Sequence, residues 1–211
     1  MSRSPVTPET LAAALAARLV HDLSGPASGV ASGLELHADP DLPEMKADGL
    51  NLAAASSYAL VDLLEFCRVA FGATGEPLAA DALGKLAQTQ FTGKRAALDW
   101  SPSAAELSGA QAQALLILAQ IAAGGLALGG TARATTMTGG GWVALRVEGQ
   151  SQRAQLQPEA LEGMAGRPLS AGLAGRWAPA YYLHNLATGL GGSVHAEARE
   201  DGFVMEARLP A

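Results

Sequence analysis

Cysteine and aromatic residues are scarce in this chain of 211 residues. There is one cysteine, Cys67, and there are only three Trp, three Tyr and four Phe. A single cysteine excludes an intrachain disulfide and a cysteine-rich metal site. Because Ala, Gly and Leu supply most of the apolar bulk, we expect closely packed helices rather than a core built around aromatic rings. Apolar residues make up 49% of the chain, which is too many for a predominantly disordered protein.

Charged residues are also few, at 16% of the chain, with 14 basic and 20 acidic side chains and a net charge of −6. This acidic balance argues against nucleic acid or an anionic membrane as the main partner. Residues 1–5 contain no apolar run of the kind that marks a signal peptide. We therefore expect a cytoplasmic protein that binds neither nucleic acid nor a membrane.

One long stretch has no charge at all, between Glu106 and Arg133. A membrane span needs about 20 mostly apolar residues. Three glutamines interrupt this stretch and two glycine pairs weaken its end. The pattern therefore favours a buried helix of a globular domain, from Ser108 to about Ala123.

The first third of the chain has the pattern of two long helices. Thr7-Pro8-Glu9 is a typical helix start, with a capping hydroxyl, a proline at the first position and an acid in the first turn. Apolar residues then recur at spacings of four and three, at Leu11, Leu15, Leu19, Leu23, Ala27, Val30 and Leu34. A second stripe begins near Asp41 and ends at Gly72, with Met45, Gly49, Leu52, Ser56, Leu60, Leu63, Cys67 and Ala70.

Two such helices joined by a short connection predict an antiparallel hairpin, which we assign as a first domain over residues 1–72. Further apolar residues, Leu50, Val61, Leu64 and Phe71, widen the face of the second helix. A lone hairpin cannot cover faces this wide. We therefore expect a homodimer in which two hairpins form a four-helix bundle.

The remainder, residues 78–211, has an α+β pattern and is assigned as a second domain after a linker. We expect helices at Asp81–Gln90, Ser108–Ala123 and Pro179–Thr188. Strands are expected at Ala96–Trp100, 131–137, 142–147, Ser193–Arg199 and Phe203–Pro210. Glycines 139–141 mark the turn between the strands expected at 131–137 and 142–147.

His21 is the first candidate for chemistry. With about 100° per residue, it falls about 180° from the middle of the leucine stripe, so it should face solvent. Small residues share its face, namely Ala14, Ala17, Gly25, Ser28 and Ser32. An exposed imidazole is a competent nucleophile toward an acyl phosphate, and small neighbours would let another protein approach. The plainer interpretation is a surface histidine without a function.

The hexapeptide His21–Pro26 has the pattern His-acid-Leu-x-x-Pro, which resembles the phosphoacceptor box of bacterial sensor histidine kinases. The end of the chain resembles the close of their ATP-binding domain, in Leu190-Gly191-Gly192-Ser193-Val194 and in Glu206-Ala207-Arg208-Leu209-Pro210. The nucleotide-binding residues of a kinase are missing. The chain has only Asn51 and Asn185, neither of them in the helix that should carry a magnesium-binding Asn. The Asp-x-Gly-x-Gly motif is replaced by Val147-Glu148-Gly149-Gln150-Ser151, so an ATP-dependent kinase is disfavoured.

An acceptor histidine combined with a degenerate ATP site resembles the ChpT family of histidine phosphotransferases. Three further segments match that family, Leu34–Leu36, Leu64–Gly72 and Leu118–Ala123. The resemblance implies a cytoplasmic homodimer with a C-terminal α/β sandwich like a degenerate histidine-kinase ATPase domain. It also implies a relay of phosphoryl groups from the receiver domain of a hybrid histidine kinase to response regulators, in bacterial cell-cycle signalling.

The resemblance implies that His21 is the phosphoryl acceptor and that Asp22 is the acidic residue found next to it in the family. We expect Asp22 to orient the imidazole, although a solvated acid without a role fits the sequence as well. Arg18, Ser28 and Ser32 are candidate contacts for a receiver. No metal ion and no cofactor are expected. The alternative function is a dimeric module that binds receiver domains without using His21.

Overall fold

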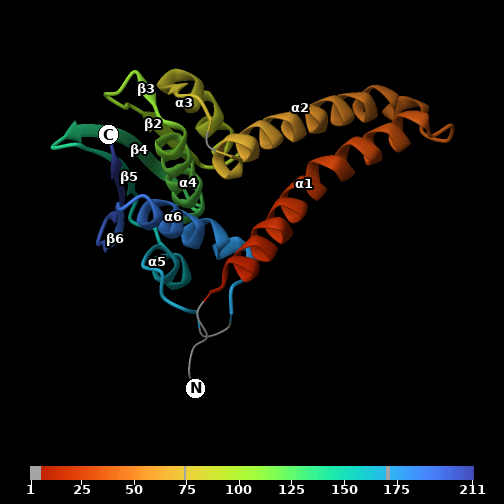
Figure 1. Ribbon diagram of the computed structural model, residues 1–211. Helices are drawn as coiled ribbons and strands as arrows, with labels where there is room; N and C mark the ends of the chain where they lie inside the picture. Colours follow the sequence, from red (N-terminus) through yellow and green to blue (C-terminus); the bar gives the residue numbers. More distant parts are fainter. Residues whose placement is uncertain (1–5, 74, 170–171) are drawn as a thin grey trace.

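The computed structural model describes residues 6–73, 75–169 and 172–211. The amino-terminal segment 1–5 and linker residue Thr74 therefore lie outside the described residues. A long helical hairpin projects from a mixed α/β unit that contains the carboxyl terminus (Figure 1). This arrangement agrees with the α+β fold class expected from the sequence.

Two helices, α1 (Pro8–Ala38) and α2 (Lys46–Phe71), form the hairpin. The Thr7 hydroxyl accepts a hydrogen bond from the Thr10 amide at 3.2 Å, which confirms the predicted cap. The second helix begins later than predicted, because Pro43–Met45 form a 3-10 turn before it. It ends at Gly72 as expected.

Glycines bring the backbones of the two helices close together. A Cβ atom added to Gly33 would lie 2.6 Å from the carbonyl oxygen of Gly49, and one added to Gly49 would lie 2.7 Å from the carbonyl oxygen of Gly33. The backbones are therefore in direct contact, and a side chain at either position would force the helices apart. Several of the large apolar side chains remain exposed instead, among them Val20, Leu34, Leu50, Leu52, Val61 and Leu64.

Within the described residues, one helical stretch, Pro43–Phe71, is long and apolar enough to cross a membrane as judged by length and composition alone. One side of this stretch packs on α1 through Gly49 and Ala53, both of which are buried. The exposed apolar side chains lie on the rest of its surface.

A five-stranded sheet forms the frame of the α/β unit, in the order β2-β4-β5-β7-β6. The strands are β2 (Ala96–Trp100), β4 (Gly130–Gly139), β5 (Trp142–Gln150), β6 (Ser193–Arg199) and β7 (Gly202–Pro210). The edge strand β2 runs parallel to β4, and the other neighbours are antiparallel. All five expected strands are present, and Gly140 and Gly141 adopt the positive φ angles that the β4–β5 turn requires.

The helices of this unit are α3 (Ala80–Thr89), α4 (Gly109–Gly125), α5 (Pro158–Met164) and α6 (Ala178–Gly189), with a 3-10 turn at Gly175–Trp177. Sequence analysis missed α5 and the short pair β1 (Leu78–Ala79) and β3 (Glu106–Leu107). Asp81 lies in the first turn of α3 rather than at its cap. Ser108 and Gln111 form a reciprocal capping box at the start of α4.

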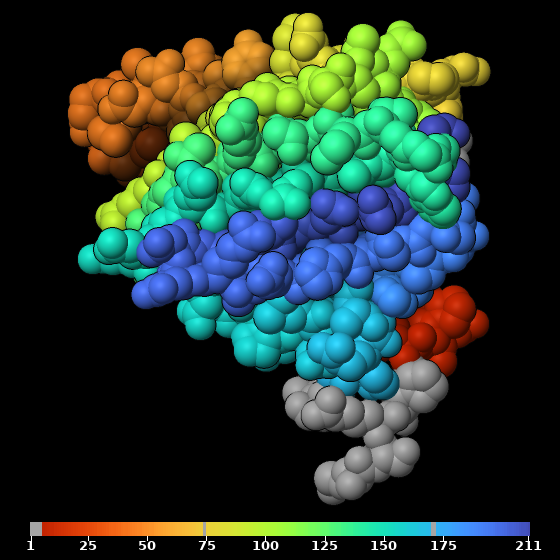
Figure 2. Space-filling model, turned by 90° about the vertical axis from the view of Figure 1, so that its left-hand side faces the viewer, coloured from red at the N-terminus to blue at the C-terminus, as the bar shows by residue number. Residues whose placement is uncertain are grey.

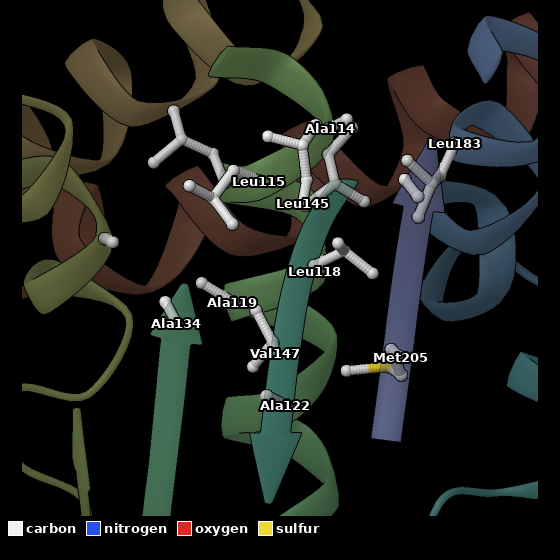
Figure 3. Close-up of a cluster of buried hydrophobic side chains, with 14 of the residues drawn as sticks. Ala114, Leu115, Leu118, Ala119, Ala122, Ala134, Leu145, Val147, Leu183 and Met205 are labelled. Atoms are coloured by element: carbon white, nitrogen blue, oxygen red, sulfur yellow. The ribbon is translucent and has the colours of Figure 1, made fainter. Parts of the chain in front are cut away.

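The uncharged stretch forms the centre of the core as α4. Ala114, Leu115, Leu118, Ala119 and Ala122 pack against side chains of β4, β5, β7 and α6 (Figure 3). Every residue from Gln111 to Ala119 is buried, which confirms the prediction of a buried helix. Burying side chains of this kind is worth roughly 0.8 kcal/mol per methylene group, so α4 contributes strongly to the stability of this unit.

None of the helices that the structure describes covers the opposite face of the sheet. In Figure 2 the strands lie side by side across the surface that faces the viewer. This face carries ion pairs within and between strands, namely Arg146 with Glu148 on β5 and Arg146 with Glu206 of β7. The unit is therefore a two-layer sandwich with one apolar and one polar sheet face.

The α/β unit is docked against α1. Leu11 and Ala14 are buried together with Ala178 and Tyr181 in a small apolar cluster. Ala14 was predicted to line the open face around His21. That prediction was wrong, because α6 covers this end of the face. A Cβ atom on Gly175 would lie 3.0 Å from the Ala14 carbonyl oxygen, so the backbone also approaches closely here.

Candidate functional site

His21 lies near the middle of α1 and points into solvent, with 84% of its side chain exposed. Ser28 and Ser32 are exposed on the same face of the helix, about two and three helical turns beyond His21. Gly25 lies between them and His21, and a Cβ atom there would meet nothing within 4 Å. The structure thus brings the predicted histidine and the two serines onto one open, small-residue surface.

Asp22 links His21 to Arg18. The Nδ1 atom of His21 lies 3.1 Å from Oδ1 of Asp22, and the Nε atom of Arg18 donates to Oδ2 of Asp22 at 2.5 Å. The carboxylate is mostly buried, with 20% of its side chain exposed. An ionised carboxylate can only accept hydrogen bonds, so it selects the tautomer in which Nδ1 carries the proton. The other ring nitrogen, Nε2, then keeps its lone pair and faces solvent as the available nucleophile.

A groove of about 470 Å³ runs beside His21 between the hairpin and the α/β unit. Its hairpin wall includes Arg18, His21 and Asp22, together with Ala59, Asp62 and Leu63 of α2. The other wall is formed by the end of α3 and the turn before β2, through Thr89, Gln90, Thr92 and Lys94. The groove is therefore built jointly by two parts of the chain that are far apart in sequence.

Lys94 adds a cation to the second wall of this groove. Burial lowers the pKa of the Lys94 ammonium, the nearby Arg18 lowers it further, and Asp22 opposes the shift. These mutual effects indicate that Lys94 shares the electrostatic environment of Arg18 and Asp22. A positive charge beside His21 suits an incoming phosphoryl group and an acidic protein surface.

Cys67 lies on the stripe of α2 and is half-buried. Burial raises the pKa of its thiol to about 11, with a further contribution from Asp22. A thiol with this pKa stays protonated at neutral pH and is a poor nucleophile. The prediction that Cys67 is a packing residue is confirmed.

Two segments that lack the nucleotide-binding motifs of a kinase, the helix α4 and the end of β5, make structural contacts instead. Gln113 of α4 donates to the carbonyl oxygen of Gly72 at 2.6 Å and so ties α4 to the end of the hairpin. Gly149 packs closely against the ring of Phe203, so that any side chain at this position would overlap with that ring. Among the residues that the structure describes, no group of three or more His, Cys, Asp or Glu side chains is arranged to hold a metal ion.

Sequence reasoning found Arg18, His21 and Asp22 but missed the second wall of the groove. Thr89, Gln90, Thr92 and Lys94 form no motif and lie far from His21 in the sequence. Only the packing of the α/β unit on the hairpin places them beside the imidazole. A single sequence holds no signal for that placement.

The comparisons with known proteins agree with this picture. The family model of the histidine phosphotransferase C-terminal domain matches residues 80–202. The comparison with curated protein sequences gives no match. A solved structure of a bacterial phosphotransferase is 22% identical and has a TM-score of 0.82, with 98% of this chain and 100% of that chain covered.

Two solved histidine kinases are more distant matches. The histidine kinase domain of the blue-light activated kinase EL346 from Erythrobacter litoralis is 13% identical, with a TM-score of 0.48, and 87% of this chain and 95% of that one are covered. The histidine kinase AdeS from Acinetobacter baumannii is also 13% identical, with a TM-score of 0.48 and coverage of 91% and 94%.

Proposed function

Because the chain belongs to the histidine phosphotransferase family, we propose that it relays phosphoryl groups between receiver domains through His21. The observation that carries this proposal is the linked series Arg18–Asp22–His21, which ends in an exposed ring nitrogen with a free lone pair. The donor is the receiver domain of a hybrid histidine kinase. The acceptors are response regulators, in bacterial cell-cycle signalling in the cytoplasm.

Transfer begins when Nε2 of His21 attacks the phosphorus atom of an aspartyl phosphate on a docked receiver. The new N–P bond forms as the bond from phosphorus to the aspartyl oxygen breaks, and the electron pair leaves with that carboxylate. The proton on Nδ1 stays in place, so the ring becomes a cationic phosphoimidazole. The carboxylate of Asp22 compensates that positive charge across the 3.1 Å contact. Attack by an aspartate of a second receiver reverses the step.

Arg18 holds the carboxylate of Asp22 in this position. Its Nε atom is bound to the oxygen that does not face His21, so both oxygens of the carboxylate are engaged. An orienting group that is itself held in place is a common feature of activated histidines. Arg18 is thus a positioning residue rather than a catalytic one. Ser28 and Ser32 lie where a receiver bound over His21 would contact α1.

The protein acts as a homodimer in this proposal. Leu50, Val61 and Leu64 lie on the side of α2 that is turned away from Ala59 and the groove, and each is about half exposed. Burying a leucine side chain contributes roughly 1.5–3 kcal/mol, so a second hairpin packed here would be strongly favoured. Both copies of His21 would remain open to receivers, because they lie on the other face of the hairpin.

The test is transfer from a radiolabelled, phosphorylated receiver domain of a hybrid kinase. We expect label on the wild-type protein and none on His21→Ala, with the fold intact because an exposed substitution usually costs within about 0.5 kcal/mol. His195→Ala is the matched control, since His195 is exposed on β6, away from the groove. Label retained on His21→Ala would exclude this relay. Receiver binding without label on the wild type would favour the alternative function, an interaction module.

A further inference from the structure

A short turn of the α/β unit lies directly on α1 at Arg18. It is the 3-10 turn Gly175–Trp177, which comes immediately before α6. A Cβ atom added to Gly175 would lie 3.0 Å from the carbonyl oxygen of Ala14 and 3.3 Å from the amide nitrogen of Arg18. These two atoms belong to one hydrogen-bonded step of the helix, because each amide of an α-helix donates to the carbonyl four residues earlier. The 3-10 turn therefore rests on the part of α1 that carries Arg18.

The chain on either side of this turn is anchored to α1 by apolar contacts. After the turn, Ala178 and Tyr181 of α6 are buried together with Leu11 and Ala14 of α1. Before the turn, Leu173 packs against the same cluster. Burial of apolar side chains at both ends fixes where the turn meets α1.

The side chain of Arg18 has open space on two sides. It borders both the groove beside His21 and a cavity of about 210 Å³ next to Trp177. A Cβ atom on Gly175 would lie 3.4 Å from the Cβ atom of Arg18, so the turn supports the base of this side chain. At the other end, the Nε atom of Arg18 donates to Asp22 at 2.5 Å. The turn and Asp22 together therefore hold the side chain of Arg18 in its conformation.

Glycine at position 175 serves the close approach to α1 and not an unusual backbone conformation. Gly175 does not adopt a positive φ angle, so a side chain there is not strained by the backbone itself. The three heavy atoms nearest to an added Cβ all belong to Ala14 and Arg18. Alanine at this position would press on α1, and valine would press harder. The turn would then move away, and the side chain of Arg18 would gain rotamer freedom.

We propose that the turn Gly175–Trp177 positions the imidazole of His21, with Gly175 as the positioning residue. The turn supports the base of Arg18, and Arg18 holds Oδ2 of Asp22. Oδ1 of the same carboxylate lies 3.1 Å from Nδ1 of His21. The α/β unit thereby helps to select the Nδ1-protonated ring. The effect on phosphoryl transfer rests on the proposed function, whereas the effect on the ring does not.

The first measurement follows the ring of His21 in unphosphorylated protein, through the nitrogen chemical shifts of labelled histidine. The variant His21→Ala assigns its signals. Above the pH at which the ring titrates, we expect mainly the Nδ1-protonated tautomer in the wild type and a smaller fraction in Gly175→Val and in Arg18→Gln. Gly175→Ala should give a smaller decrease. Gly124→Ala is the control, because Gly124 lines the same cavity as Arg18 but an added Cβ atom meets nothing within 4 Å.

The second measurement asks whether the turn acts through Arg18. In single-turnover transfer from a phosphorylated receiver, Arg18→Gln should be about 10- to 100-fold slower than the wild type, the usual loss for an outer orienting group. Gly175→Val should also be slower. Combining Gly175→Val with Arg18→Gln should cause no further loss, because two residues that act as one unit are not additive. General damage to the fold would instead multiply the two losses.

The proposal is wrong if Gly175→Val leaves the tautomer fraction of His21 unchanged, or if its loss and that of Arg18→Gln multiply. If Gly175→Val does not fold, Gly175→Ala decides on the same two readouts. A wild-type protein that takes no label, but whose ring responds to Gly175→Val, would contradict the relay alone. Labelling of the wild type together with an unresponsive ring would contradict the positioning role alone.

Discussion

Oδ1 of Asp22 lies 3.1 Å from Nδ1 of His21, on the side of the ring opposite to the nitrogen that faces solvent. The carboxylate therefore acts on the nucleophile through the imidazole and not by touching the phosphoryl group.

Asp22→Asn should slow phosphoryl transfer while leaving the histidine in place. An amide can donate as well as accept, so it no longer selects the Nδ1-protonated ring, and it cannot compensate the cationic phosphoimidazole. Loss of an orienting partner of this kind commonly costs about 10- to 100-fold in activity. The measurement is the single-turnover rate from a phosphorylated receiver. Asp48→Asn, an exposed site on α2, is the control, and equal rates in both variants would remove Asp22 from the mechanism.

Lys94→Gln should weaken productive docking of a receiver. Removing a rim charge reduces the rate of association and its dependence on salt, and we expect a loss of about three- to tenfold at low ionic strength. Transfer rates measured across a salt series give the readout. Lys85 is exposed on α3 but does not line the groove, so Lys85→Gln is the matched comparison. A salt dependence unchanged from wild type would show that receivers do not use this wall.

Substitutions that place charged side chains on the outer face of α2 test whether the protein is a homodimer. Val61→Glu combined with Leu64→Glu should shift the mass measured by light scattering from a dimer toward one chain of 21.4 kDa. Leu190→Glu matches these positions in exposure, at 45% against 49% and 48%, but lies on the α/β unit and should leave the mass unchanged. A wild-type protein that is monomeric at micromolar concentration would contradict the four-helix bundle.

Cys67 should react slowly with alkylating reagents in the folded protein. Burial raises its thiol pKa to about 11 from an ordinary value of 9.0, so at pH 8 its thiolate fraction is about 100-fold smaller than that of a free thiol. The rate should rise tenfold for each pH unit until the pH approaches that value. Protein unfolded in urea provides the reference rate. Similar rates in the folded and unfolded states would show that the junction between the hairpin and the α/β unit is open.

The long helices and the strands were predictable because their residues follow local periodic patterns. The stripe of α2 and the capping residue Thr7 belong to this class, and so does the exposure of His21. The contact between the two helices of the hairpin was harder to predict from the sequence. Gly33 lies outside the apolar stripe of α1, yet its backbone is in close contact with that of Gly49 across the hairpin. Leucines dominate the pattern, and several of them face outward.

The groove was not predictable from the sequence, for a related reason. It is formed where the α/β unit packs on the hairpin, against Ala14 of α1 and Ala70 of α2, with Gly175 close to α1. Alanine and glycine are common throughout this chain, so no pattern distinguishes these positions from others. The same holds for Lys94, whose position beside Asp22 follows from the docking alone.

The groove beside His21 has one wall on the hairpin and the other on the turn around Lys94. The atoms that would carry a phosphoryl group and the residues that would discriminate among its donors are therefore encoded in separate stretches of the gene. In the proposed relay, mutations near the turn can change which signalling proteins bind, while the imidazole of His21 and the carboxylate of Asp22 are unchanged. After gene duplication, two such proteins can come to bind different signalling partners while each keeps the residues for phosphoryl transfer.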